Sequence, residues 1–378
     1  MRFPTLFVLL LGRVLSCNEA ERDSKASISG RGSTTDTRHS RIIPRGVGQS
    51  DTSNARMSPP DGAIVVDSSG RSSIPISHLT VQSGVDALDR RTNAPQILFI
   101  YPGVYHEQVF IPPMPSNLTI QGYTPDGRSY TNNTVTITQN LALINTTSDD
   151  LTATLRNWNS NTKVYNINLA NTFGRAATNG QSLAVSAHVG GQGYYGVQFL
   201  GFQDTILANK GAQLYAKCLI VGAVDFIFGQ TAQAWFDQVD IRTNGFGYIT
   251  ASGRDNYTNP SWFVINNSTI QGINSSMPAG STYLGRPWRS FARVVIQNTF
   301  LDTVVKPQGW SIWEKDQPNT QNVTFAEYSN GGPGSTRVQQ KVPRANFSGV
   351  LNTSIKPDTV LGKAFWNEWW VDLNYLFL

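Results

Sequence analysis

The amino-acid sequence predicts an all-β fold: a right-handed, single-stranded parallel β-helix with a short N-terminal capping helix. Short apolar runs separated by polar turns fill residues 95–305, and hardly any stretch there has the pattern of a long amphipathic helix. Similar phrases recur around Phe199, Leu219, Val239 and Thr269 at intervals of about 20 to 30 residues, roughly one coil of a solenoid. Short strands repeated at this interval favour a parallel β-helix over a sandwich.

The N-terminal residues differ from the rest of the 378-residue chain. Arg2 precedes an apolar run at residues 3–11, so residues 1–17 are interpreted as a secretory signal peptide. Residues 18–60 are polar and lack an apolar period, which indicates a disordered linker or pro-segment. Residues 61–378 then form the folded domain. No later apolar run is long enough to span a bilayer, so we expect a secreted, extracellular protein without a membrane partner.

The expected elements follow the chain in order. A first strand at residues 62–66 precedes a short helix at 77–88, with Ser77 as N-cap, which covers the open end of the stack. The aromatic tail at 364–378 is expected to pack back on the stack and cover an apolar side. The other expected strands lie at residues 97–101, 118–120, 135–137, 164–167, 196–200, 238–241, 262–265, 268–270 and 294–296.

Glycosylation motifs, cysteines and charge narrow the possible partners. The Asn-x-Ser/Thr motifs support secretion. Cys17 leaves with the signal peptide, so Cys218 has no partner. The net charge of +5 suits an acidic partner, but the basic residues are scattered and no nucleic-acid-binding motif is present. Neither cysteine nor histidine clusters at metal-ligand spacing, so no metal is expected. The glycosylation motifs begin at Asn117, Asn132, Asn145, Asn256, Asn266, Asn267, Asn274, Asn322, Asn346 and Asn352.

Asp225 is the one charged residue in the apolar stretch 218–229. Because neighbouring side chains of a strand point to opposite faces, Asp225 faces away from a core that holds Val224 and Phe226. Asp204 lies one coil earlier and Gln181 another coil before it, at steps of 21 and 23 residues. Residues one coil apart lie roughly 4.8 Å apart, so an amide and two carboxyl groups would form one ladder. Two carboxyl groups that close have pKa values pushed apart, which provides an acid beside a base for acyl transfer.

Three other motifs bear on the chemistry of the site. Residues 191–196 match a dinucleotide fingerprint, but a strand follows instead of a helix, so no nucleotide site is expected. Ser186 and His188 share a strand face but lie too far apart for a direct hydrogen bond. Arg286, in the motif at residues 284–288, can hold a carboxylate ionised through a bidentate pair, and Trp288 offers a face for a sugar ring. The alternative for this motif is a structural salt bridge beside a core tryptophan.

Together these motifs resemble the pectin methylesterases (pectinesterases), and the pattern at residues 193–241 is closest to the fungal branch. The resemblance implies a secreted carbohydrate esterase that removes C6 methyl esters from pectin and releases methanol in cell-wall modification and pectin degradation. It also implies a monomer that needs neither a metal nor an organic cofactor. The blocks that match in order and spacing are residues 103–107, 181–185, 201–205, 224–229 and 284–288.

The resemblance also assigns roles to individual residues. Asp225 is the nucleophile, and Asp204 is the general acid that later acts as base. Gln181 and Gln203 hold the oxyanion, and Arg286 orients the nucleophile. The residues implied in substrate binding are Arg286, Trp288 and Phe228.

Two departures and two alternatives accompany this interpretation. Val197 replaces a cysteine that would pair with Cys218, and Ser252 stands where glutamine is common.

One alternative is another β-helix pectin-degrading enzyme, either a lyase, which needs a calcium-binding acid cluster, or a polygalacturonase. The four histidines provide no Gly-His-Gly motif of the latter. The second alternative is a silent pectin-binding protein, which loss of a catalytic carboxylate would signal, whereas both are present.

Overall fold

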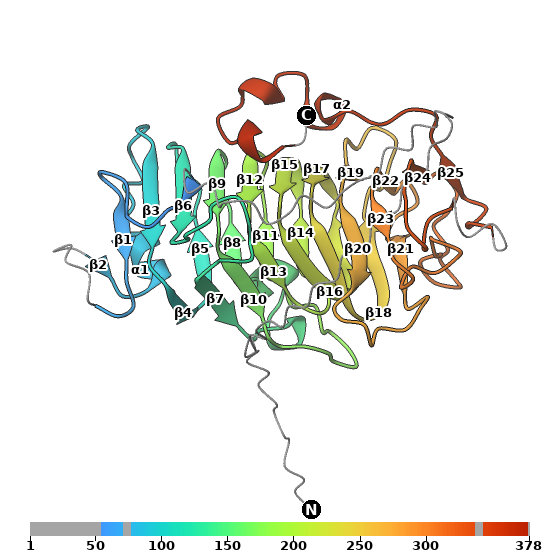
Figure 1. The fold of residues 1–378 in the computed structure, drawn as a ribbon, viewed down its shortest axis with the longest axis horizontal. Coiled ribbons are helices and arrows are strands. Elements are labelled where there is room, and N and C mark those ends of the chain that lie inside the picture. The colour runs from blue at the N-terminus through green and yellow to red at the C-terminus, as the bar shows by residue number, and fades with distance from the viewer. Residues whose placement is uncertain (1–53, 71–76, 337–342, 377–378) are drawn as a thin grey trace, which may run out of the picture. The chain divides into compact units, whose positions relative to one another are not determined.

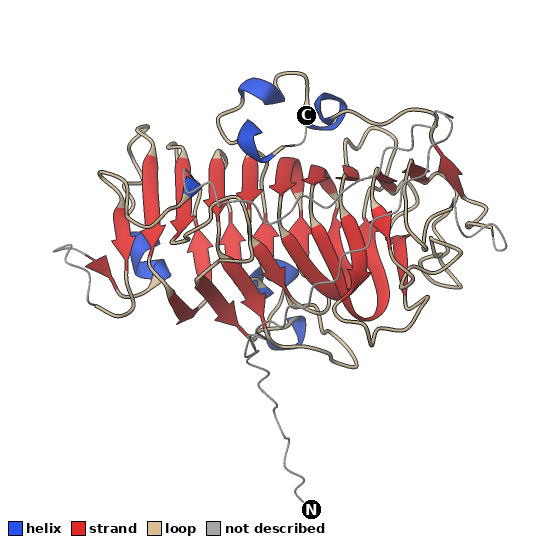
Figure 2. Ribbon diagram, in the orientation of Figure 1, coloured by secondary structure: helices blue, strands red, loops and turns tan. Residues whose placement is uncertain are grey.

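The strands of the chain pair in parallel, coil upon coil (Figures 1 and 2). A computed structural model describes residues 54–70, 77–336 and 343–376. The fold is a parallel β-helix, which confirms the predicted class. The predicted signal peptide and most of the predicted linker lie outside the described residues. No helix in the described part of the chain is long and apolar enough to cross a membrane.

Three faces make up the wall of the β-helix. Face A is a 12-stranded sheet. Its strands, in order, are β2 (Ser77–His78), β1 (Ile64–Val66), β3 (Gln96–Ile100), β6 (Leu118–Gly122), β9 (Thr162–Tyr165), β12 (Gln192–Tyr195), β15 (Lys210–Ala216), β17 (Thr231–Asp237), β19 (Trp262–Asn266), β22 (Arg293–Gln297), β24 (Thr324–Tyr328) and β25 (Ser348–Val350).

The other two faces share their longest strands, because β16 (Leu219–Gly229) and β18 (Asp240–Ser252) run through both. Face B holds their first parts with β4 (Gly103–His106), β7 (Val135–Gln139), β10 (Asn168–Asn171), β13 (Gln198–Leu200), β20 (Thr269–Gly272) and β23 (Phe300–Leu301). Face C holds their last parts with β5 (Val109–Ile111), β8 (Leu155–Asn157), β11 (Val185–Ala187), β14 (Ile206–Ala208) and β21 (Thr282–Pro287).

The capping helix forms, but it is shorter than predicted. Helix α1 spans Val81–Asp86, and its N-cap is Thr80, whose side chain accepts a hydrogen bond from the Ser83 amide. The prediction of Ser77 as N-cap was wrong, because Ser77 belongs to β2 and pairs with β1. Gly84, in the middle of the helix, allows close packing, since a Cβ there would lie 2.6 Å from Val66. The other helices named among the described residues are α2 (Pro357–Leu361) and the short 3-10 turns η2 (Leu143–Asn145), η3 (Asp149–Thr152), η4 (Phe365–Asn367) and η5 (Leu373–Tyr375).

The corner between faces A and B is made by residues in the left-handed conformation. Asn166, Lys217 and Gln238 have φ values of 52°, 52° and 53°. Such a residue turns the chain sharply and therefore ends a strand. The predicted strands at 164–167 and 238–241 were wrong in their bounds for this reason, because the first crosses a corner and the second begins on one.

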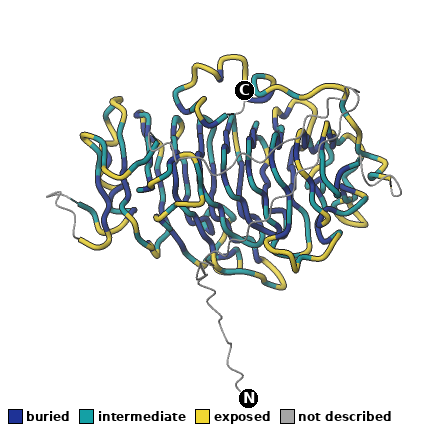
Figure 3. Tube along the Cα trace, viewed as in Figure 1, coloured by how far each residue is buried: buried dark blue, intermediate teal, exposed yellow. Residues whose placement is uncertain are grey.

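The interior is filled by side chains that repeat from coil to coil. The rings of Tyr194, Tyr215 and Phe236 stack with centroid distances of 5.0 and 4.6 Å, and all three side chains are fully buried. Residues one coil apart occupy the same position on the face, so like side chains form continuous rows. Figure 3 shows the result, with buried residues along the strands and exposed residues in the loops.

The C-terminal segment, residues 357–376, covers the outside of face A, and α2 packs on β15 and β17 (Figure 1). The Tyr195 hydroxyl donates to the Trp370 carbonyl at 2.7 Å and accepts from the Asp372 amide at 2.8 Å. Trp370 and Tyr375 are 3% and 2% exposed. The prediction that this tail packs on the stack is confirmed for residues 364–376.

Residues before the predicted domain border at 60–61 already contact the β-helix, and Arg56 makes these contacts. The Arg56 guanidinium donates to the Asn166 side chain at 2.6 Å and lies over the Tyr165 ring. Its backbone pairs with Thr124. The border itself stays a prediction.

Candidate active site

Asp204 and Asp225 lie side by side in neighbouring coils at the corner between faces B and C. Asp225 interrupts β16 at a register shift, with φ at 50°, and Asp204 lies between β13 and β14, with φ at 62°. Gln203 pairs with Val224, which sets the two aspartates in register. The predicted neighbourhood is confirmed, but strand alternation was the wrong reason. The left-handed turn at Asp225, rather than the pleat of a regular strand, sets the direction of its side chain.

A cavity of about 190 Å³ opens at this corner. It brings together every site residue that the sequence indicated, and it adds three that sequence reasoning missed. Asp149 begins the short turn η3, Trp313 lies in a loop and Ala251 lies in β18, and none of the three belongs to a recognisable motif. The residues that line the cavity are Asp149, Gln181, Gln203, Asp204, Asp225, Phe228, Ala251, Arg286, Trp288 and Trp313.

Arg286 holds Asp225 through a bidentate ion pair. Its Nε donates to Asp225 Oδ1 at 2.9 Å, and its Nη2 donates to Oδ2 at 2.6 Å. The guanidinium lies between the rings of Tyr248 and Trp313, at 4.1 and 4.0 Å, and donates to the Trp313 carbonyl. Both carboxylate oxygens accept from a group that can only donate, so this geometry fits an ionised Asp225.

The surroundings of Asp204 and Asp225 act differently on the pKa values of the two carboxyl groups. Burial, together with the nearby charges of Asp225 and Asp149, raises the pKa of Asp204 well above its ordinary value. Burial also raises the pKa of Asp225, but the hydrogen bonds and charge of Arg286 oppose that rise. Asp204 is therefore the group that keeps a proton, and Asp225 is the group that is held as an anion.

Two amides and an apolar wall complete the cavity. Gln181 Oε1 is buried and finds no hydrogen-bond partner among the described residues. Phe228 and Trp288 lie 6.3 Å apart between ring centroids, in an apolar cluster on the outside of face C. Trp288 lies over Gly253, where a Cβ would come within 2.5 Å of its ring. The cavity lining thus combines polar groups with flat apolar surface.

The two departures in the sequence lie outside the cavity lining. Cys218 is a free, buried cysteine, and burial raises the pKa of its thiol to about 12. Val197 is buried in the core beside it. Ser252 is also buried, and its hydroxyl accepts from the Arg293 amide at 3.2 Å. Ser252 therefore ties the chain after β21 to face C.

Replacing Arg286 by lysine should lower kcat/KM for the expected ester hydrolysis about 100-fold, because a small misplacement of a reacting group costs that much. Lysine keeps the charge but has neither the planar fork for both Asp225 oxygens nor a flat surface for Tyr248 and Trp313. The matched control is Arg242→Lys, since Arg242 holds Asp240 with the same bidentate geometry outside the cavity. Equal rates for the two variants would show that the fork on Asp225 has no role in the reaction.

A parallel β-helix with paired aspartates and flat aromatic walls at one cleft defines the class of carbohydrate-active β-helix enzymes. Within this class, the pectinesterase family model matches residues 63–358. The chain belongs to the pectinesterase family. It is an esterase of that family, and its fungal relatives confirm the predicted branch.

Individual relatives agree over nearly their whole lengths. A pectinesterase of Aspergillus niger is 44% identical over 326 residues, which cover 85% of this chain and 94% of that protein. A pectinesterase of Aspergillus aculeatus has the same identity and coverage. A crystal structure of the pectin methylesterase from Aspergillus niger matches with a TM-score of 0.76 and 34% identity, and covers 85% of this chain and all of that one.

Proposed function

We propose that the protein hydrolyses the C6 methyl esters of pectin through an acyl-enzyme on Asp225. The observation that supports this most is the unequal treatment of two adjacent carboxyl groups. Arg286 pairs with Asp225 alone, whereas Asp204 is buried beside it without a hydrogen bond from that guanidinium. An anion beside a protonated acid is the combination that ester cleavage requires.

The first half-reaction forms the acyl-enzyme. The Asp225 carboxylate attacks the C6 carbonyl, and the carbonyl oxygen becomes an oxyanion that the side-chain amides of Gln181 and Gln203 stabilise. The C–O bond to the methoxy group then breaks, and Asp204 gives its proton to the departing methanol. Asp225 is left in a mixed anhydride with the sugar carboxyl group.

The second half-reaction releases the product. Asp204, now a carboxylate, takes a proton from water, which attacks the anhydride and regenerates Asp225 as an anion. Arg286 keeps Asp225 oriented throughout, and Phe228 and Trp288 hold the sugar rings. Neither step consumes an external electron or proton donor.

The same proposal includes the setting in which the enzyme works. The apolar N-terminal run and the Asn-x-Ser/Thr motifs support secretion. An extracellular monomer that acts on methyl-esterified homogalacturonan would serve cell-wall modification and pectin degradation.

The test is methanol release by the purified, secreted protein in the presence of EDTA. We expect release from highly methylated pectin, and none from polygalacturonate, which carries no ester. Binding of pectin without release of methanol would favour a silent binding protein, and cleavage of the polymer backbone would favour a lyase or a hydrolase.

A further inference from the structure

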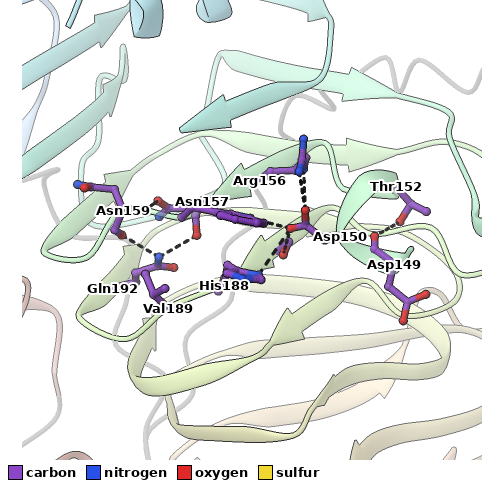
Figure 4. A network of polar contacts seen from close by, with 12 residues as sticks. Asp149, Asp150, Thr152, Arg156, Asn157, Asn159, His188, Val189 and Gln192 are labelled. Carbon is purple, nitrogen blue, oxygen red and sulfur yellow. Dashed lines mark hydrogen bonds and ion pairs between the residues drawn. The ribbon is translucent and has the colours of Figure 1, made fainter. Parts of the chain in front are cut away.

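Asp149 places a third carboxyl group in the cavity. It is the first residue of η3, and its side chain lines the cavity beside Asp204. Within the described ranges, its carboxylate has no hydrogen-bond or ion-pair partner, and Figure 4 draws none for it. A half-buried carboxylate without a cation is unusual, because buried charges are normally paired.

The neighbouring residue, Asp150, shows that this turn is held in place. Asp150 accepts two hydrogen bonds from Arg156, at 2.9 and 2.7 Å, one from Trp158 at 3.0 Å and one from Ser186 at 2.7 Å (Figure 4). These contacts fix η3 on the outside of face C. The charge of Asp150 is thus compensated by Arg156 and its side chain is fixed, whereas the Asp149 carboxylate in the same turn has no cationic partner among the described residues.

The backbone of the turn is anchored on its other side as well. The Thr152 hydroxyl donates to the Asp149 carbonyl at 2.8 Å and accepts from the Leu183 amide at 3.1 Å. Figure 4 shows the Asp149 carboxylate directed away from the Asp150 network. Its position at the cavity is therefore set by the fold.

The charges of the cavity do not balance when Asp149 is ionised. Among the residues that line it, Arg286 is the sole cation. Its Nε and Nη2 donate to Asp225, and its Nη1 donates to the Trp313 carbonyl. The Asp149 charge is close enough to raise the pKa of Asp204. Burial also raises the pKa of Asp149, so its charge is present only above that raised value. A ligand carboxylate entering this cavity would meet an excess of negative charge and no unpaired cation.

We propose that Asp149 determines substrate specificity by rejecting de-esterified galacturonate units next to the ester under attack. The inference rests on the proposed function. A methyl-esterified neighbour is neutral and is tolerated, whereas a free uronate is repelled. Because the product is itself a uronate, the same repulsion favours its release.

The test compares two pectins of equal length, one of high and one of low methyl-ester content, at a pH where Asp149 is ionised. For Asp149→Asn we expect the ratio of kcat/KM on low-methyl to high-methyl pectin to rise about tenfold, since a partly screened pair of charges amounts to roughly that factor. The inhibition constant of unesterified oligogalacturonate should fall by about the same factor. Asp149→Ser removes the charge with a smaller side chain and replaces the Asn variant if that one does not fold.

The control is Asp61→Asn, which removes an exposed carboxylate outside the cavity and should leave both quantities unchanged. A shift of the pH profile by Asp149→Asn that is equal on both pectins, with a constant ratio, would overturn the proposal. Asp149 would then act only through the pKa of Asp204. If the wild type releases no methanol even from highly methylated pectin, the proposed function fails, and this inference fails with it.

Discussion

Asp225→Asn should reduce methanol release on the order of 10⁴-fold or more, because removing a catalytic nucleophile leaves only the binding and oxyanion contributions. Asparagine has nearly the shape of aspartate and keeps one oxygen for Arg286, so the cavity should stay intact. The amide cannot form the anhydride. The measurement is the initial rate of methanol release from highly methylated pectin, with pectin binding measured on the same preparation.

The control for Asp225→Asn is Asp240→Asn. Asp240 has the same bidentate partner geometry, to Arg242, but lies outside the cavity lining. It should retain wild-type activity after a similar loss of ion pairing. Equal methanol release by Asp225→Asn and the wild type would remove Asp225 as nucleophile, and with it the whole assignment of roles.

Asp204→Asn should lower kcat by about 10²- to 10⁴-fold, which is the usual contribution of a general acid. Methanol is a poor leaving group unless it receives a proton, and asparagine has none to give at this position. The acidic limb of the pH–rate profile should remain, while the limb that reports loss of the Asp204 proton should disappear. An unchanged pH profile together with an unchanged rate would show that another group supplies the proton.

The same substitution should stabilise the fold at higher pH. Because the pKa of Asp204 is raised in the folded protein, the folded state binds more protons than the unfolded chain between the two pKa values. Wild-type stability therefore falls as the pH rises from the unfolded value, about 3.9, through the raised folded value. The Asp204→Asn variant has no carboxyl group at this position and therefore does not lose stability in this pH range for this reason. The difference in melting temperature should vanish in acid and grow towards neutral pH, and a constant difference would contradict the raised pKa.

Much of the fold followed from local patterns. The short apolar runs and the recurring coil length predicted the parallel β-helix, because both reflect strands that stack in one direction. The aromatic residues of the C-terminal tail indicated that the tail packs on the stack, since their apolar surface must be buried. Strand bounds such as residues 164–167 were wrong because the left-handed corner at Asn166 has no pattern of its own in a single sequence.

Some residues of the site could likewise be predicted from the sequence, and others could not. The spacing of Asp204 and Asp225 was sufficient to place these two side chains together, because one coil length brings them into register. The pairing of Arg286 with Asp225 was implied by the family resemblance alone. Asp149 lies in the short turn η3 and Trp313 in a loop, and the course of both connections depends on what the whole stack leaves exposed. No period or motif could indicate them.

By itself, the sequence determined the coil length, the apolar rows and the identity of the chemical groups, since these are properties of local order along the chain. Only the tertiary structure decided which carboxyl group receives the guanidinium, which is buried without it and which is left unpaired. Those differences arise from burial and from distances between residues on different coils, such as the 2.6 Å contact from Arg286 to Asp225. The different protonation of Asp204, Asp225 and Asp149 is therefore a property of the folded protein, because three carboxyl groups of the same kind acquire different charges only in their separate surroundings.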